Sequence, residues 1–69
     1  MGDPRLGSRL KEARTAAGLT QQGLADKASV SRKTINTVEN GVFIPSTLLA
    51  LDLARALETT VEALFFLKD

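Results

Sequence analysis

Apolar residues recur every three or four positions along the chain, and no stretch of any length alternates as a half-buried strand would. This spacing predicts α-helices, because it collects apolar side chains on one side of a helix with about 3.6 residues per turn. The fold class expected is all-α. The predicted helices cover about residues 5–17, 21–28 and 32–40, followed by one that Pro45 and Ser46 open and one that Thr60 caps.

The inward positions of these helices predict a single core in one domain, residues 1–69, with its packed part at about 5–66. The first helix is expected to end at Gly18, which favours a left-handed C-terminal conformation. The expected apolar stripes are Leu6, Leu10, Ala13 and Ala17, then Leu49, Ala50, Leu53 and Leu57, and finally Val61, Leu64 and Phe65.

The helices at 21–28 and 32–40 begin with the same arrangement of side chains. An apolar residue precedes a hydroxyl residue that can cap the helix, and a second apolar residue stands at the fourth helical position. The two series are Leu19-Thr20-Leu24 and Val30-Ser31-Ile35. Two short helices joined by about three residues must cross steeply, which is the geometry of a helix-turn-helix.

Composition narrows the chemistry that the chain can perform. The 69 residues include no Cys and no His, which removes thiol and imidazole catalysis and the usual zinc and haem ligands. We therefore expect no enzyme, metal or cofactor. The absence of a long apolar run predicts no membrane span, and a core this small favours dimerisation.

The charge is unevenly distributed although its sum is only +1. Residues 1–40 carry seven basic and four acidic side chains, a net +3, whereas residues 41–69 carry two basic and four acidic ones, a net −2. The positive half contains the predicted helix-turn-helix, as a nucleic-acid partner would require.

The helix at 32–40 has a polar outer face suited to DNA. A helical wheel places Lys33, Asn36, Thr37 and Asn40 opposite Ile35 and Val38, with Arg32 at the flank. In the major groove Arg or Lys can donate to guanine, Asn can pair with adenine, and a Thr methyl can touch the thymine methyl. Solvated side chains on a surface helix are the alternative interpretation.

With these residues in view, the chain resembles the phage-repressor and Cro-like helix-turn-helix family, called XRE-like. The matching segments, in order, are Arg14-x-x-x-Gly18-Leu19-Thr20-Gln21, Leu24-Ala25, Val30-Ser31-Arg32-x-Thr34-Ile35, Val38-Glu39-Asn40-Gly41 and Pro45-Ser46, followed by Leu49-Ala50 and Leu53-Ala54. The resemblance implies a compact five-helix, lambda-repressor-like domain that binds double-stranded DNA, usually as a dimer on an inverted repeat, and regulates transcription.

The resemblance also implies roles for individual residues. Base contacts are expected from Arg32, Lys33, Asn36 and Thr37, and phosphate contacts from Thr20, Gln21, Asn40 and Gly41. Arg14 and Glu39 are expected to form an ion pair joining the first and third helices.

Two positions and one segment depart from the family's pattern. Ser29 stands where the tight turn usually has Gly, and a left-handed conformation there would cost a non-Gly residue roughly 1–2 kcal/mol. Gly23 replaces the acidic residue of a capping box. Val42-Phe43-Ile44 replaces a polar segment, so a phosphate-binding lysine is missing.

More apolar residues are present than the five-helix core requires. A homodimer seam is one explanation, with Leu64, Phe66, Leu67, Leu48 and Phe43 as its candidates. Partial burial against the chain's own loop and C-terminus is the other.

These observations favour a sequence-specific DNA-binding regulator, a repressor or an autoregulating controller, in the cytoplasm of a bacterium or phage host and associated with the nucleoid. The alternative is a protein-interaction module or toxin–antitoxin partner on the same fold, with weak or no DNA binding; its support is the low net charge and the apolar 42–44 segment.

Overall fold

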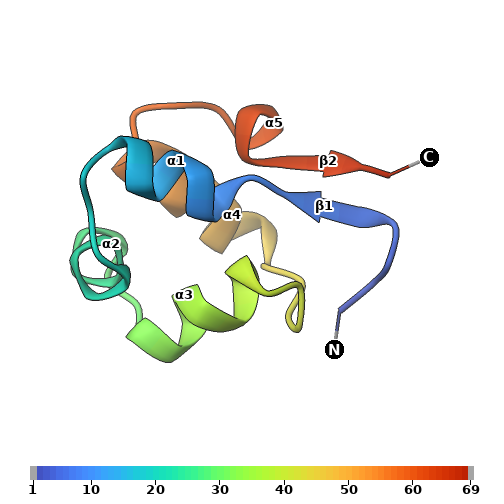
Figure 1. The fold of residues 1–69 in the computed structure, drawn as a ribbon, viewed down its shortest axis with the longest axis horizontal. Helices are drawn as coiled ribbons and strands as arrows, with labels where there is room; N and C mark the ends of the chain where they lie inside the picture. The colour runs from blue at the N-terminus through green and yellow to red at the C-terminus, as the bar shows by residue number, and fades with distance from the viewer. Residues whose placement is uncertain (1, 69) are drawn as a thin grey trace.

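The computed structural model of the chain describes residues 2–68, which form five helices and two short strands (Figure 1). The helices are α1 (Leu10–Ala16), α2 (Gln21–Ala28), α3 (Arg32–Glu39), α4 (Thr47–Ala56) and α5 (Val61–Leu64), and the strands are β1 (Leu6–Ser8) and β2 (Phe65–Leu67). The five predicted helices are confirmed in order and approximate position. No helix among the described residues is long and apolar enough to cross a membrane.

Hydroxyl side chains fix where α2 to α5 begin. Thr20 and Ser31 accept hydrogen bonds from the N–H groups of the third helical residues, at 2.9 and 3.2 Å. Ser46 and Thr60 do the same for α4 and α5, each at 3.1 Å. Each cap satisfies an N–H group that has no partner within its helix. All four starting points agree with the sequence prediction.

The first four helices end in the same left-handed turn. Gly18, Ser29, Gly41 and Glu58 have φ values of 74°, 59°, 72° and 55°. The next residue then donates its N–H back into the last turn of the helix, as Val30 does to the carbonyl of Ala25 at 2.9 Å. The left-handed conformation predicted for Ser29 is confirmed. The one at Glu58 was not foreseen.

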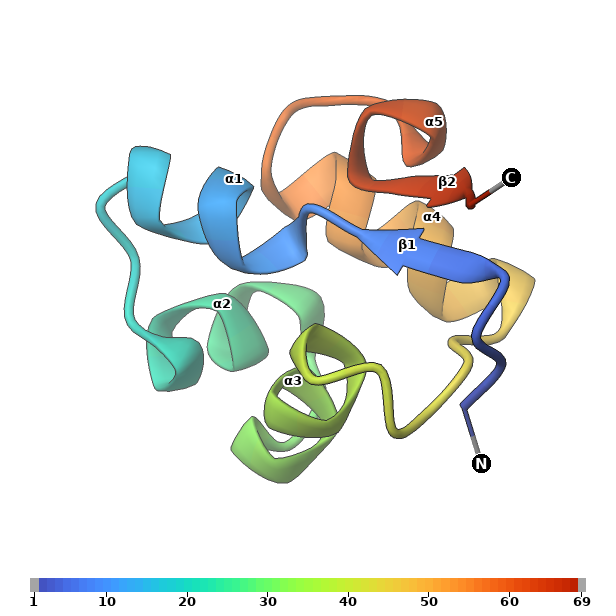
Figure 2. The ribbon, with the colours of Figure 1, turned by 45° about the vertical axis from the view of Figure 1, so that its right-hand side comes forward.

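A pair of short strands, which the sequence did not predict, accompanies the five helices of the all-α fold. β1 and β2 pair antiparallel, with Leu6 opposite Leu67 and Ser8 opposite Phe65 (Figure 2). The helix predicted from residue 5 therefore starts at Leu10, and Phe65 lies in a strand. The extended conformation of β1 depends on a partner at the other end of the sequence, which periodicity within one segment does not reveal.

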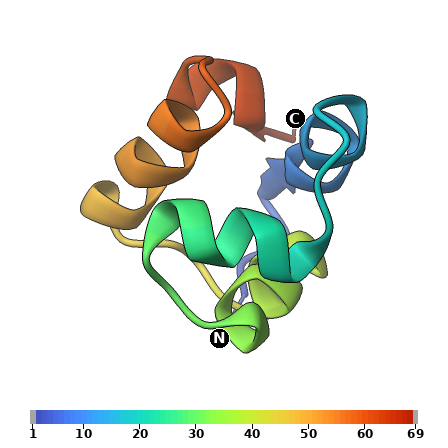
Figure 3. The same ribbon diagram turned by 90° about the vertical axis from the view of Figure 1, so that its left-hand side faces the viewer.

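The core lies where α2 packs against both α3 and α4 (Figure 3). Its largest side chains have no more than 1% of their surface exposed. These are Leu10, Leu24, Ile35, Val38, Leu53 and Leu64. The predicted stripe of α1 is wrong at its ends, because Leu6 is half-buried in β1 and Ala17 is exposed after the helix. The core holds α3 firmly by its inner side.

Candidate nucleic-acid interface

Helix α3 presents one apolar and one polar side. Ile35 and Val38 are buried, with 0% and 1% of their surface exposed, and anchor the helix to the core. The opposite side carries exposed Arg32, Lys33, Asn36 and Asn40 and half-buried Thr37. The helix runs along the edge of the molecule (Figures 1 and 2), so an approaching surface can reach this polar side.

A buried ion pair joins α1 to the C-terminal end of α3. The Arg14 guanidinium donates through Nε to Glu39 Oε2 at 2.6 Å and through Nη2 to Oε1 at 3.3 Å. Its Nη1 donates to the carbonyl of Leu19 at 2.8 Å. The side chains are only 10% and 2% exposed. The pair expected between these residues is present, and it fixes α3 relative to α1 and the turn before α2.

The amide of Gln21 connects this ion pair to the polar side of α3. Its Nε2 donates to Glu39 Oε1 at 3.2 Å and to Asn36 Oδ1 at 3.1 Å. Asn40 Nδ2 donates to the same Asn36 oxygen at 3.2 Å. Sequence reasoning assigned Gln21 to phosphate and missed this internal network. No signal in the sequence pointed to it, because the partners come from two helices whose separation only the fold determines.

The remaining predicted contact residues differ in what they can offer. The hydroxyl of Thr37 donates to the carbonyl of Thr34 at 3.0 Å, so its methyl group remains for an apolar contact. Within residues 2–68, neither Arg32 nor Lys33 forms an ion pair, so both charges are available to a ligand. Thr20 caps the start of α2, and Gly41 follows the end of α3.

An apolar hollow borders the outer side of α3. It measures about 310 Å³ and is lined by Lys33, Thr34, Thr37, Val42 and Phe43. Phe43, expected at a dimer seam, therefore lies beside two of the predicted base-contacting residues. A partner subunit at this position would cover them.

Two more of the predicted dimer residues are used by the chain's own packing. Leu64 is fully buried in the core, so its assignment to a subunit interface is wrong. The ring of Phe66 lies against Gly7 of β1, and the guanidinium carbon of Arg9 is 4.1 Å from the ring centre. Leu48 and Leu67 remain exposed, at 70% and 77%.

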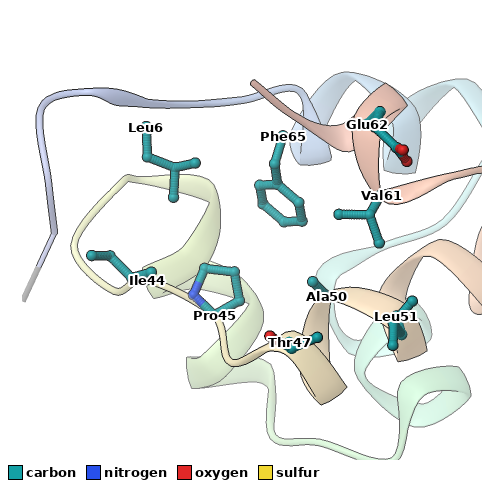
Figure 4. A pocket seen from close by; sticks show the side chains of 9 residues that line it. All are labelled: Leu6, Ile44, Pro45, Thr47, Ala50, Leu51, Val61, Glu62 and Phe65. Atoms are coloured by element: carbon teal, nitrogen blue, oxygen red, sulfur yellow. The ribbon is translucent and has the colours of Figure 1, made fainter. Parts of the chain in front are cut away.

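A larger apolar groove has no lining residue from α3 (Figure 4). It measures about 460 Å³, and its walls come from β1, the segment before α4, the first turns of α4, and α5 with the start of β2. The lining residues are Leu6, Ile44, Pro45, Thr47, Ala50, Leu51, Val61, Glu62 and Phe65. Leu51, which is 54% exposed, was not among the predicted dimer residues.

Comparison with known proteins agrees with this geometry. A helix-turn-helix family model matches residues 10–64. Over 62 residues the chain is 40% identical to an uncharacterized HTH-type transcriptional regulator of Archaeoglobus fulgidus, covering 90% of this chain and 89% of that protein. It is 34% identical to YgzD, an uncharacterized HTH-type transcriptional regulator of Bacillus subtilis, with 90% and 94% covered.

A solved structure is similar as well. The crystal structure of the restriction-modification controller protein C.AhdI from Aeromonas hydrophila superimposes with a TM-score of 0.76 at 39% identity, covering 78% of this chain and 82% of that one. These matches describe DNA-binding regulators rather than enzymes. The chain belongs to the helix-turn-helix family of DNA-binding transcriptional regulators of the XRE and Cro-like type.

Proposed function

We propose that this chain binds specific double-stranded DNA sequences by placing α3 in the major groove. The observation that supports this most strongly is the outer side of α3, where Arg32, Lys33 and Asn36 are exposed on a helix held by the buried Arg14–Glu39 pair. Cationic and amide side chains can donate to base edges, and the methyl of Thr37 can contact thymine.

Phosphate contacts on either side of the groove position the helix. The first N–H groups of α2 are free of helical partners, so the backbone at Gln21 can donate to a phosphate while the side chain holds Asn36. Thr20, Asn40 and Gly41 complete the set. Val42 and Phe43 carry no charge. Their apolar contact with the deoxyribose groups of the DNA backbone takes the place of the phosphate contact that a lysine would make.

Binding measured at several salt concentrations tests this proposal. Each neutralised phosphate contributes about 0.9 to the slope of log K against log salt. A regulator with the contacts above gives a steep slope and a selected sequence from a random DNA pool. A flat response and no selected sequence would indicate the protein-interaction module instead.

Lys33→Ala is expected to weaken the base preference at one position per half-site by about 1–3 kcal/mol. A loss of affinity that is equal for all sequences would make Lys33 a phosphate contact.

We also propose that a second copy of the chain covers the apolar groove. Leu6, Phe65 and Leu67 share one face of the sheet, since opposite and alternate residues of paired strands point the same way. Leu48 and Leu51 extend the apolar surface along α4, and no residue of α3 lines the groove. A symmetric dimer through this face leaves both recognition helices free for an inverted repeat with half-sites about 34–36 Å apart.

Sedimentation of two matched variants tests the dimer. Leu51→Glu places a charge in the groove and is expected to give a monomer at concentrations where the wild-type chain is a dimer. Val42→Glu changes an equally exposed apolar residue outside the groove and is expected to leave the dimer intact. A monomeric wild-type chain at high micromolar concentration would contradict the proposal. Phe66→Glu is less informative, because Phe66 packs on Gly7 within one chain.

A repressor or an autoregulating controller is the role that such a dimer supports. C.AhdI, similar over most of its length, is a restriction-modification controller protein. Binding to an inverted repeat that overlaps the promoter of the gene encoding this chain would support autoregulation. Association with the nucleoid would follow from DNA binding. A toxin–antitoxin role would instead require a stable complex with a second protein.

A further inference from the structure

The oxygen and the nitrogen of the Asn36 side chain have different surroundings. Oδ1 accepts hydrogen bonds from Gln21 Nε2 at 3.1 Å and from Asn40 Nδ2 at 3.2 Å. An amide oxygen has two lone pairs, so these two donors occupy it fully. Within residues 2–68, Nδ2 donates to no protein acceptor, and the residue is exposed. The group that Asn36 offers to a ligand is therefore an N–H donor.

The buried ion pair fixes this orientation. Glu39 is a carboxylate that can only accept, so the Gln21 atom 3.2 Å from its Oε1 must be the amide nitrogen. The same nitrogen faces Asn36, whose facing atom must then be an acceptor. Arg14 in turn holds the Glu39 carboxylate at 2.6 Å. The polarity of a surface amide on α3 is thus set by a charge pair inside the protein.

We propose that Asn36 reads DNA as a hydrogen-bond donor only and selects guanine, with Gln21 as its positioning residue. This inference rests on the proposed entry of α3 into the major groove. Guanine presents two acceptors there, O6 and N7, and can pair with both hydrogens of the amide nitrogen. Thymine presents one acceptor, O4, beside its methyl group, adenine places an N6 donor beside its N7 acceptor, and cytosine presents an N4 donor. The Asn–adenine pairing expected from sequence requires the amide oxygen as well, and that oxygen is occupied.

Gln22 provides a matched control on the same helix. Its Nε2 donates to Asp26 at 2.8 Å, one turn further along α2, and within residues 2–68 its side chain forms no hydrogen bond with α3. Replacing Gln21 or Gln22 with Met keeps the length of the side chain and removes its donors. Only the Gln21 variant removes one of the two hydrogen bonds to the Asn36 oxygen, which leaves Asn40 as its single donor and frees one lone pair for a base.

Selection of bound sequences from a random DNA pool tests the inference with four proteins. Asn36→Ala identifies the position that Asn36 reads, because preference is lost there. The wild-type chain is expected to select guanine at that position. Gln21→Met is expected to lower the guanine-to-adenine ratio there by about fivefold or more, the size of one specific base contact, with other positions unchanged. Gln22→Met is expected to select the wild-type sequence.

Each outcome decides a different point. Selection of adenine at that position by the wild-type chain would overturn the donor-only role. A Gln21→Met protein that loses affinity equally for all sequences would overturn its positioning role and make the side chain a phosphate contact. Enrichment of no sequence by the wild-type chain would overturn the proposed function and this inference together. Circular dichroism confirms that each variant is folded, and Gln21→Ala replaces Gln21→Met if the latter is not.

Discussion

The helix-turn-helix and the paired termini are held together by different kinds of contact. In residues 10–41, α2 and α3 start on local hydroxyl caps, all three helices end on left-handed turns, and one buried ion pair connects α1 to α3. At the termini, β1 and β2 are distant in sequence and depend on each other, through main-chain pairing and the ring of Phe66 on Gly7. Signals within a few residues thus determine where α2 and α3 begin and end. Pairing between distant segments determines where β1 and β2 lie.

The ion pairs of the two regions differ in how far they are buried. Arg14 and Glu39 are 10% and 2% exposed, whereas Arg5 and Asp3, 2.8 Å apart, are 79% and 29% exposed. The hydrogen bond from Arg5 lowers the pKa of Asp3 from 3.8 to about 2. A lowered pKa stabilises the fold above pH 3.8 and ceases to do so as the pH falls towards 2. Solvent screens the exposed pair, so the buried one matters more.

Removal of the Arg14 guanidinium is expected to have the largest effect. Arg14→Ala leaves the Glu39 carboxylate buried without its partner, which costs about 3–5 kcal/mol. It also frees the network that orients Asn36, so sequence preference weakens at temperatures where the protein remains folded. Thermal unfolding followed by circular dichroism and DNA selection measure the two effects.

Arg9→Ala is the control for that substitution. Arg9 precedes the same helix but is exposed and lies over the Phe66 ring, so only about 0.5–1 kcal/mol is expected from its loss. Equal melting temperatures for the two variants would show that the buried pair does not stabilise the fold more than a surface contact does.

Gly7→Ala tests the terminal region with a smaller expected effect. A Cβ at Gly7 would overlap the ring of Phe66, which must swing away from β1 and from Arg9. The expected cost is about 1–2 kcal/mol, with DNA preference unchanged because α3 is not involved. In a Phe66→Ala background the same substitution is expected to cost less, and equal costs in both backgrounds would contradict the packing described here.

The limits of prediction from sequence follow this division. The caps at Thr20, Ser31 and Thr60 and the left-handed Ser29 were predictable, because each depends on neighbours within a few residues. The strands, and with them the correct start of α1, were not, because Gly7 and Phe66 meet only in the folded chain. At the site, the polar side of α3 was predictable from periodicity. The orientation of Asn36 was not, since it depends on atoms of Gln21 and Glu39.

Ser29→Gly is expected to have the smallest effect and to raise stability. The left-handed conformation costs a Ser more than a Gly, but Gly also gains freedom in the unfolded chain, so the net gain is about 0.5–1 kcal/mol. For a domain of this size that corresponds to an increase of about 3–6 °C in Tm.

Two further glycine substitutions test whether the gain at Ser29 comes from its left-handed backbone. Glu58→Gly changes the equivalent position at the end of α4, where φ is 55°, and is expected to raise Tm by a similar amount. Ser31→Gly makes the same exchange two residues after Ser29 but at a cap with φ of −80°, where stability is expected to fall slightly. If Ser29→Gly lowered Tm while Glu58→Gly raised it, the Ser29 side chain would have to stabilise the turn in a way that its backbone conformation does not explain.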